Sequence, residues 1–251
     1  MKDLKGRYLL KSIGDVLLPR TCVVCGRELN VDEDHICVYC AADMPYTYFN
    51  LQDHNQMSDK YNDLIQRDLS DFEPYSFGIA LFYYNPMNGY ANITKSLKYH
   101  RDFSAGKYFS DMLADSIASA THLADLDLVI PIPLHWSRYW IRGYNQAEII
   151  ASRIAKRLNI TCDNHILYRA KHTKTQTHLS TDQKYLNVQN TFKVKKSTHS
   201  RQTLSGSRHI LLVDDVFTTG ATVNACRLAL RNFDATPADV RISIATLAFV
   251  G

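Results

Sequence analysis

The stretch Ile210-Leu-Leu-Val-Asp-Asp-Val-Phe-Thr-Thr-Gly-Ala-Thr222 decides the fold of this chain. Its first four apolar residues predict a buried strand that stops at two adjacent carboxylates, Asp214 and Asp215, before a small, hydroxyl-rich turn opens a helix. A helix N-terminus presents unpaired backbone N–H groups and the positive end of the helix dipole, so it suits a phosphate. Carboxylates at the end of a strand can accept hydrogen bonds from sugar hydroxyls, and open α/β sheets bind ligands at this edge.

The turn itself carries residues suited to phosphate contact. Gly220 lets the backbone approach a ligand closely, and the hydroxyls of Thr218, Thr219 and Thr222 can donate hydrogen bonds to phosphate oxygens. A plain turn, in which Asp215 and Thr218 only cap the helix, is the alternative. Two adjacent carboxylates repel each other unless a ribose diol or a magnesium ion compensates, so the complete string favours ligand binding.

Strands and helices alternate on both sides of this string, which predicts an α/β fold with a mostly parallel sheet. We expect strands at 75–84, 128–132, 209–213 and 240–249. We expect helices at 88–99, 104–119 (with Ser104 as its N-cap), 147–158 and 220–232. The polar segment 168–208 is interpreted as a long mobile excursion with a short helix near 181–189.

Four of the six cysteines form the pattern Cys22-x2-Cys25-x11-Cys37-x2-Cys40. Paired cysteines in a chain without a secretory signal indicate metal ligands before disulfides. Two such pairs complete a tetrahedron around Zn²⁺, and a closed four-thiolate site is structural rather than catalytic. Four buried or redox-active thiols remain the alternative.

Length and composition set the domain organisation. The 251 residues, 45% of them hydrophobic and 22% charged, exclude a disordered, collagen-like or coiled-coil chain. We expect an N-terminal helix and zinc module over 1–43, a linker with a short helix over 44–74 and the α/β domain over 75–251. No apolar run is long enough for a membrane span, and the N-terminus lacks a signal core, so we expect a cytoplasmic protein.

The net charge of +4 is unevenly distributed, because residues 161–208 carry +7 and the rest of the chain carries −3. This basic segment is either a solvated face or a hood that closes over phosphates and tracks a single-stranded phosphate backbone. The basic stretch around Arg138 and Arg142 also holds both tryptophans, Trp136 and Trp140. We expect these two, four residues apart, to pack an apolar face, with stacking on nucleic-acid bases as the alternative.

The string at 210–222 resembles the phosphoribosyl-pyrophosphate (PRPP) motif of type I phosphoribosyltransferases. The resemblance implies that the two acids hold the ribose hydroxyls, that the turn holds the 5′-phosphate, and that Mg²⁺ accompanies PRPP. The PRPP-binding residues it implies are Asp214, Asp215, Val216, Phe217, Thr218, Thr219, Gly220, Ala221 and Thr222.

Further motifs resemble the ComF family of phosphoribosyltransferase-like proteins. They are Leu17–Gly26, Ile130–Gln146, Lys98-Tyr99 with Asp102, and Arg169 with Thr173, Gln176, Leu179 and Asn187. The resemblance implies that Arg138, Arg142 and Lys98 contact pyrophosphate. Lys184 departs from the pattern, since the family usually has arginine there and a bidentate phosphate contact would be lost.

The resemblance implies a PRPP-binding accessory factor in the uptake of single-stranded DNA during competence. The zinc module and the basic segment would then contact DNA or proteins of the competence machinery. A working phosphoribosyltransferase of nucleotide or salvage metabolism is the alternative, and a PRPP sensor without catalysis is a third. No residue pattern identifies an acceptor. A glutamine amidotransferase does not fit, because the first cysteine, Cys22, lies inside a zinc-type pair.

Overall fold

The computed structural model describes residues 19–68, 74–170 and 191–251. The expected N-terminal helix and the expected short helix near 181–189 lie outside these residues, as does Lys184.

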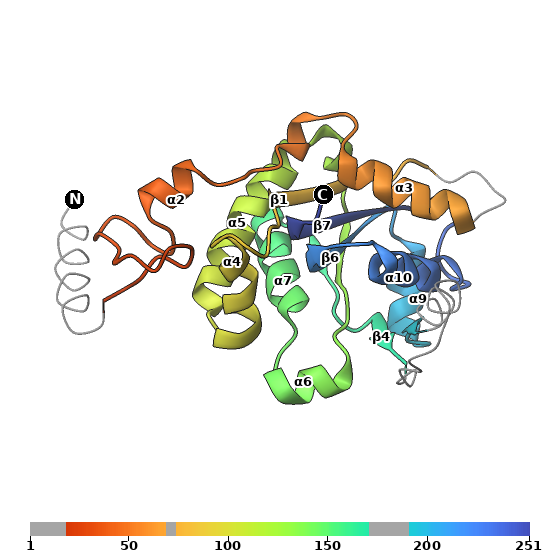
Figure 1. The fold of residues 1–251 in the computed structure, drawn as a ribbon. Coiled ribbons are helices and arrows are strands. Elements are labelled where there is room, and N and C mark those ends of the chain that lie inside the picture. Colours follow the sequence, from red (N-terminus) through yellow and green to blue (C-terminus); the bar gives the residue numbers. More distant parts are fainter. Residues whose placement is uncertain (1–18, 69–73, 171–190) are drawn as a thin grey trace, which may run out of the picture.

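Five parallel strands form the central sheet, in the order β1-β7-β6-β2-β3 (Figure 1). Their bounds are β1 Gly78–Tyr83, β2 Leu128–Pro131, β3 Thr161–Cys162, β6 His209–Phe217 and β7 Arg241–Phe249. The inner strands are apolar runs that are buried almost throughout, because helices cover both faces of a parallel sheet. The predicted α/β fold class is confirmed.

Helices cover both faces of the sheet (Figure 1). Helices α5 (Phe103–Ser119) and α7 (Gln146–Leu158) lie on one face, and α3 (Gln56–Asp68) and α10 (Ala221–Arg231) lie on the other. The predicted helix at 147–158 is confirmed, since its apolar stripe is buried against the sheet. Its outer side is joined to α5 by the ion pair of Arg153 with Asp111, at 2.6 Å.

Shorter elements complete the chain. They are α2 (Val38–Ala42), η1 (Phe49–Leu51), α4 (Ala91–Lys95), the π-helical turn η2 (Ser96–His100), η3 (Thr121–Leu123), α6 (Trp136–Arg142), α9 (Thr198–Ser205), and the antiparallel pair β4 (Leu167–Arg169) and β5 (Phe192–Val194). Both ends of the expected excursion at 168–208 are therefore folded, and its middle lies outside the described residues.

The expected linker at 44–74 carries helix α3, which packs on the sheet. Met57, Tyr61 and Ile65 of this helix are buried, and the Asn62 amide donates a hydrogen bond to the backbone oxygen of Ser76 at 2.7 Å. The described part of this segment therefore belongs to the core rather than connecting two units.

Two expected boundaries are wrong. Strand β6 does not stop at Val213 but continues to Phe217, because it keeps pairing with β7 over its whole length. Helix α5 is capped by Asp102 rather than Ser104, since the Asp102 carboxylate accepts a hydrogen bond from the Ala105 backbone N–H at 2.9 Å. Neither α3 nor any other helix among the described residues is both long and apolar enough to span a bilayer.

Candidate functional site

A cavity of about 470 Å³ lies at the carboxyl edge of the sheet. Six of the residues that the sequence singled out line it: Lys98, Arg138, Arg142, Asp214, Asp215 and Thr222. The chain thus brings together residues from η2, α6, β6 and α10, which are far apart in sequence.

The sheet register explains why the two acids reach this cavity. Strand β2 pairs with β6 only as far as Pro131 and Val213, after which the Ile132 N–H donates to the Val213 carbonyl at 2.8 Å. Beyond this point β6 has a neighbour on its β7 side but none on its β2 side within the described sheet. Asp214 and Asp215 therefore stand at an open edge, where ligands of parallel sheets bind.

The positive charge of a lysine offsets the negative charge of the two adjacent carboxylates. The Lys98 Nζ lies 2.6 Å from Asp215 Oδ2, and the Asp215 backbone N–H donates to Asp214 Oδ1 at 2.8 Å. Burial and the neighbouring Asp215 raise the pKa of Asp214, and Lys98 opposes that rise. The Lys98 ammonium therefore lies directly beside the negative charge of the site.

The local backbone places Lys98 at this position. Lys98 lies in the π-helical turn η2 rather than in the regular helix expected over 88–99, and π turns are frequent at functional sites. The turn ends at Arg101, which has a left-handed backbone (φ 55°) and donates a hydrogen bond to the Arg142 carbonyl at 3.2 Å. The Arg142 guanidinium in turn lies over the Tyr99 ring at 5.3 Å. These contacts join the turn to the end of α6.

Only part of the predicted phosphate turn faces the cavity. Among the described residues, Asp214, Asp215 and Thr222 from this string line its wall, whereas Val216, Phe217, Thr218, Thr219, Gly220 and Ala221 do not. Phe217 is buried against Phe249. Thr218 and Thr219 are exposed.

Gly220 is required by the geometry of the turn. Its φ is 76°, and a Cβ atom there would lie 2.6 Å from Leu64 Cδ1 and 2.7 Å from Phe217 Cζ. The helix α10 begins directly after it, at Ala221. The turn can therefore take this tight form only with glycine.

Three polar residues of the wall, Asn145, Gln146 and Arg169, were not predicted as site residues. Gln146 Nε2 and Arg169 Nε are buried donors without a hydrogen-bond partner among the described residues. Burial, and then repulsion from Arg138, lower the pKa of Arg169. Two buried donors and converging guanidinium groups favour an anion with many oxygens. All three residues belong to the motifs that resemble the ComF family. Nothing in the charge pattern of the sequence, however, sets them apart from the other polar residues of those motifs.

The expected packing of the two tryptophans is wrong. The Trp136 residue is 57% exposed and Trp140 is 82% exposed, so helix α6 turns its aromatic side chains outward. The helix is short and begins at His135, whose Nδ1 accepts a hydrogen bond from the Ser137 N–H at 3.2 Å. It ends at Gly143, with φ 82°.

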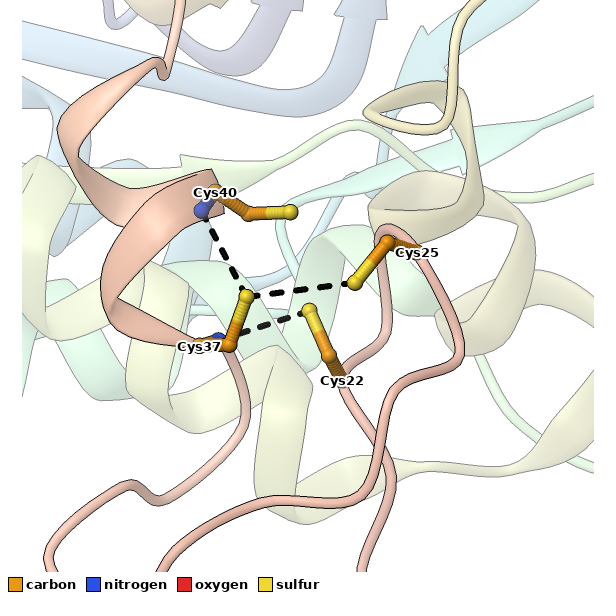
Figure 2. Close-up of side chains that lie close together, drawn as sticks. All are labelled: Cys22, Cys25, Cys37 and Cys40. Atoms are coloured by element: carbon orange, nitrogen blue, oxygen red, sulfur yellow. Dashed lines mark hydrogen bonds between the residues drawn. The ribbon is translucent and has the colours of Figure 1, made fainter.

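The four cysteines are positioned to bind a metal ion. Their Sγ atoms all lie within 4.8 Å of one another, and the Cys25 and Cys37 sulfurs are 3.8 Å apart (Figure 2). The Cys37 N–H points to Cys22 Sγ at 3.4 Å, and the Cys40 N–H points to Cys37 Sγ at 3.5 Å. His35 is not part of the cluster and contacts the Ser104 hydroxyl at 3.1 Å.

Polar groups around the cluster favour a thiolate. Burial opposes ionisation of Cys37, but hydrogen bonds from the Cys40 backbone and the Arg27 guanidinium lower its pKa to about 6. Burial and the neighbouring thiols raise the pKa of Cys40. The cluster is tied to the rest of the chain by Tyr90, whose hydroxyl donates to the Cys40 carbonyl at 2.9 Å.

The basic segment is described only in part. Lys193, Lys195, Lys196, Arg201 and Arg208 are exposed, and Arg201 pairs with Asp234 at 2.9 Å. Lys171 and Lys174 lie outside the described residues, so the predicted hood stays a prediction.

The chain is similar to one known family and to several known proteins. A family model described as a phosphoribosyl transferase domain matches residues 143–251. The chain is 39% identical over 120 residues to Competence protein F of Haemophilus influenzae, covering 47% of this chain and 51% of that protein. It thus spans about half the length of this relative. It is 27% identical over 219 residues to DNA utilization protein YhgH of Shigella flexneri, covering 86% of each chain.

Two solved structures show a weaker likeness. One is a glutamine PRPP amidotransferase from B. subtilis, with a TM-score of 0.35, 19% identity and coverage of 57% of this chain and 26% of that one. The other is an adenine phosphoribosyltransferase from Trypanosoma brucei, with a TM-score of 0.35, 12% identity and coverage of 63% of this chain and 68% of that one.

Proposed function

We propose that this chain, a member of the ComF family of phosphoribosyltransferase-like proteins, binds PRPP or a related ribose 5-phosphate and serves as an accessory factor in the uptake of single-stranded DNA. The observation that carries the proposal is the cavity in which the pair Asp214 and Asp215 faces Lys98 and three arginines. The relatives named for competence and DNA utilization support the DNA role.

Each side of the cavity suits one part of PRPP. The two carboxylates accept hydrogen bonds from the ribose hydroxyls, and Thr222, the one residue of α10 in the cavity wall, holds the 5′-phosphate. Arg138, Arg142 and Arg169 hold the pyrophosphate, because a guanidinium pairs well with phosphate oxygens. Lys98 then exchanges its contact with Asp215 for a pyrophosphate oxygen.

Magnesium accompanies the pyrophosphate in this proposal. In the part of the chain that the structure describes, the four cysteines are the one group of three or more metal-ligating side chains that lie together. The cavity therefore offers Mg²⁺ only the paired carboxylates Asp214 and Asp215. Mg²⁺ keeps several waters and is often held by one or two carboxylates plus substrate phosphates, so these acids fit it.

We further propose that the metal of the cysteine cluster is zinc and that it is structural. A tetrahedral Zn²⁺ with Zn–S bonds of about 2.3 Å places its sulfurs about 3.8 Å apart, and the Cys25–Cys37 separation of 3.8 Å fits. Four thiolates fill the coordination sphere and leave no position for a substrate. Free thiols as metal ligands suit a reducing compartment, which supports the cytoplasm as the place of action.

Ligand-induced stabilisation tests the PRPP part of the proposal. PRPP with Mg²⁺ at 100 times its Kd adds about 2.7 kcal/mol to the free energy of unfolding, which raises the Tm by roughly 5–11 °C for a chain of this size. We expect the Arg169→Ala variant to lose most of this shift. The Arg201→Ala variant, which removes an exposed guanidinium that is not part of the cavity wall, should keep it.

The proposed role in the uptake of single-stranded DNA is tested by a separate binding measurement. We expect a labelled single-stranded oligonucleotide to bind, and its affinity to fall steeply as salt rises, because basic side chains contact the backbone phosphates. Equal affinity for duplex and single strand, or no binding at low salt, would remove the DNA role and leave PRPP binding in place.

A further inference from the structure

Tyr144 lies between α6 and α7 and contacts the turn that carries Lys98. Its hydroxyl donates a hydrogen bond to the backbone carbonyl of Leu97, the residue before Lys98. Tyr144 is not among the described residues that line the cavity, whereas Lys98 and Tyr99 are. Any effect of Tyr144 on a ligand in the cavity must therefore pass through the backbone of η2.

The hydrogen bond satisfies a carbonyl near the end of this turn. The last carbonyl groups of a helix lack partners within the helix. The backbone N–H groups of Arg101 and Asp102 both donate to the Ser96 carbonyl, the second at 3.4 Å. The Tyr144 hydroxyl donates to the next carbonyl along the chain, that of Leu97. A side chain from outside η2 therefore holds the turn at its end.

The ring of Tyr144 is itself held in place. It meets the Phe103 ring edge-on, with 4.7 Å between the ring centroids. Phe103 is the first residue of α5, so the contact joins Tyr144 to a long helix of the core. Burial raises the pKa of Tyr144, so the hydroxyl keeps at neutral pH the proton that it donates. The hydroxyl is therefore fixed relative to η2.

The backbone is held on both sides of Lys98. Before it, the Leu97 side chain is fully buried, and a Cβ atom at Gly106 of α5 would lie only 2.6 Å from Leu97 Cδ1. Packing thus fixes the side chain of Leu97, while Tyr144 fixes its carbonyl. After Lys98, the Arg101 guanidinium donates to the Arg142 carbonyl at 3.2 Å.

These contacts connect η2 with the residues around the end of α6. Lys98 of η2 and Arg142 of α6 both line the cavity. Like charges repel each other, so two cations that face one ligand need a backbone that holds them in place. The hydrogen bond from Tyr144 is neutral and does not compete with the ligand for either charge.

We propose that Tyr144 is a positioning residue for PRPP binding, whose hydrogen bond to Leu97 holds η2 so that Lys98 meets the pyrophosphate from a backbone already in place. This inference rests on the proposed function, since PRPP is the ligand that Lys98 contacts there. A preorganised side chain loses less conformational freedom when the ligand binds, and the smaller loss of entropy strengthens binding. Tyr144 acts only through η2.

Titration calorimetry of PRPP with Mg²⁺ on the wild type and on Tyr144→Phe tests the inference. Phenylalanine keeps the ring and its contact with Phe103 but has no hydroxyl to donate. We expect this variant to weaken PRPP binding roughly 2- to 12-fold, which corresponds to ordering one long side chain on binding. Tyr90→Phe is the matched control, because the Tyr90 hydroxyl also donates to a backbone carbonyl, that of Cys40 at 2.9 Å. It should leave the PRPP affinity unchanged.

Ribose 5-phosphate distinguishes the positioning of Lys98 from a general loosening of the fold. It lacks the pyrophosphate that Lys98 contacts, so the wild type and Tyr144→Phe should bind it equally. The Lys98→Met background gives a second readout. Tyr144→Phe should have no further effect on PRPP affinity there, because no ammonium group remains to be positioned.

Equal PRPP affinities for the wild type and Tyr144→Phe would overturn the inference and leave the proposed function standing. A loss by the same factor for ribose 5-phosphate, or in the Lys98→Met background, would also overturn it, because Tyr144 would then only support the fold. Failure of the wild type to bind PRPP would instead remove the proposed function, and the inference with it.

Discussion

Replacing Lys98 by methionine tests the charge balance of the cavity most sharply. The Lys98 Nζ lies 2.6 Å from Asp215 Oδ2, with 24% and 12% of the two side chains exposed. Methionine keeps most of the length of the side chain but leaves two neighbouring carboxylates without this cation. Breaking a fully buried ion pair costs about 3–5 kcal/mol, so partial exposure suggests a loss of roughly 2–4 kcal/mol.

Thermal unfolding of the ligand-free protein at pH 7 is the assay. A loss of that size lowers the Tm by roughly 4–16 °C for a chain of this length. Asp215→Asn in the Lys98→Met background removes the uncompensated charge, so the double variant should recover most of the loss. Lys107→Met removes an exposed lysine of α5 and should change stability by less than about 0.5 kcal/mol.

The loss should also depend on pH in a definite direction. Burial and Asp215 hold the pKa of Asp214 above its usual value, so the folded state binds more protons than the unfolded state as pH rises above about 4. Stability from this group therefore falls with rising pH, and removal of Lys98 makes the fall steeper. The penalty should be larger at pH 8 than at pH 5. Equal Tm values for the single and double variants, or a penalty independent of pH, would refute this account of the cavity.

Three further predictions concern the turn, the cysteine cluster and a buried histidine. Gly220→Ala should cost about 1–3 kcal/mol in urea unfolding, because of its φ of 76° and side-chain contacts at 2.6 and 2.7 Å, whereas Gly206→Ala, with contacts no closer than 3.6 Å, should be nearly neutral. Cys25→Ser should lose stoichiometric zinc in elemental analysis while Cys162→Ser retains it, and equal zinc contents would contradict the proposed site. Burial lowers the pKa of His209 from 6.5 to about 4, so the stability it contributes is full above pH 6.5 and is lost as pH falls toward 4. His209→Gln should flatten that acid slope in unfolding measured from pH 7 to pH 4, and an unchanged slope would show that other groups cause it.

The sequence predicted four of the five strands of the central sheet and missed the short β3, and six of the residues it singled out line the cavity. The apolar run at 210–213 predicted a buried strand, and the structure shows that this strand carries Asp214 and Asp215 before it ends at Phe217. The spacing of the four cysteines likewise predicted the metal-binding cluster, because each pair of ligands lies within four residues of the chain. Both features depend on residues close together in the chain.

Features that depend on contacts between distant parts of the chain could not be predicted from the sequence. Strand β6 extends to Phe217 because it pairs with β7 up to that residue. The residues at 214–217 themselves show no pattern that predicts this extension. The π-helical turn that carries Lys98 and the buried donors of Gln146 and Arg169 likewise follow from tertiary packing.

Two errors of interpretation had a different cause. Trp136 and Trp140 are four residues apart, which places them near one face of α6 but does not tell whether that face meets the core or solvent. A short helix was expected inside the linker, but the spacing of Met57, Tyr61 and Ile65, which marks the buried face of the longer helix α3, was not interpreted as a core-facing pattern.

Isothermal titration calorimetry of PRPP with Mg²⁺ tests the central claim most directly. We predict one binding site per chain in the wild type and no detectable binding in the double variant Asp214→Asn/Asp215→Asn, provided that this variant unfolds cooperatively like the wild type. Failure of the wild type to bind PRPP, ribose 5-phosphate or any nucleotide would contradict the account, as would unchanged PRPP affinity in the folded double variant.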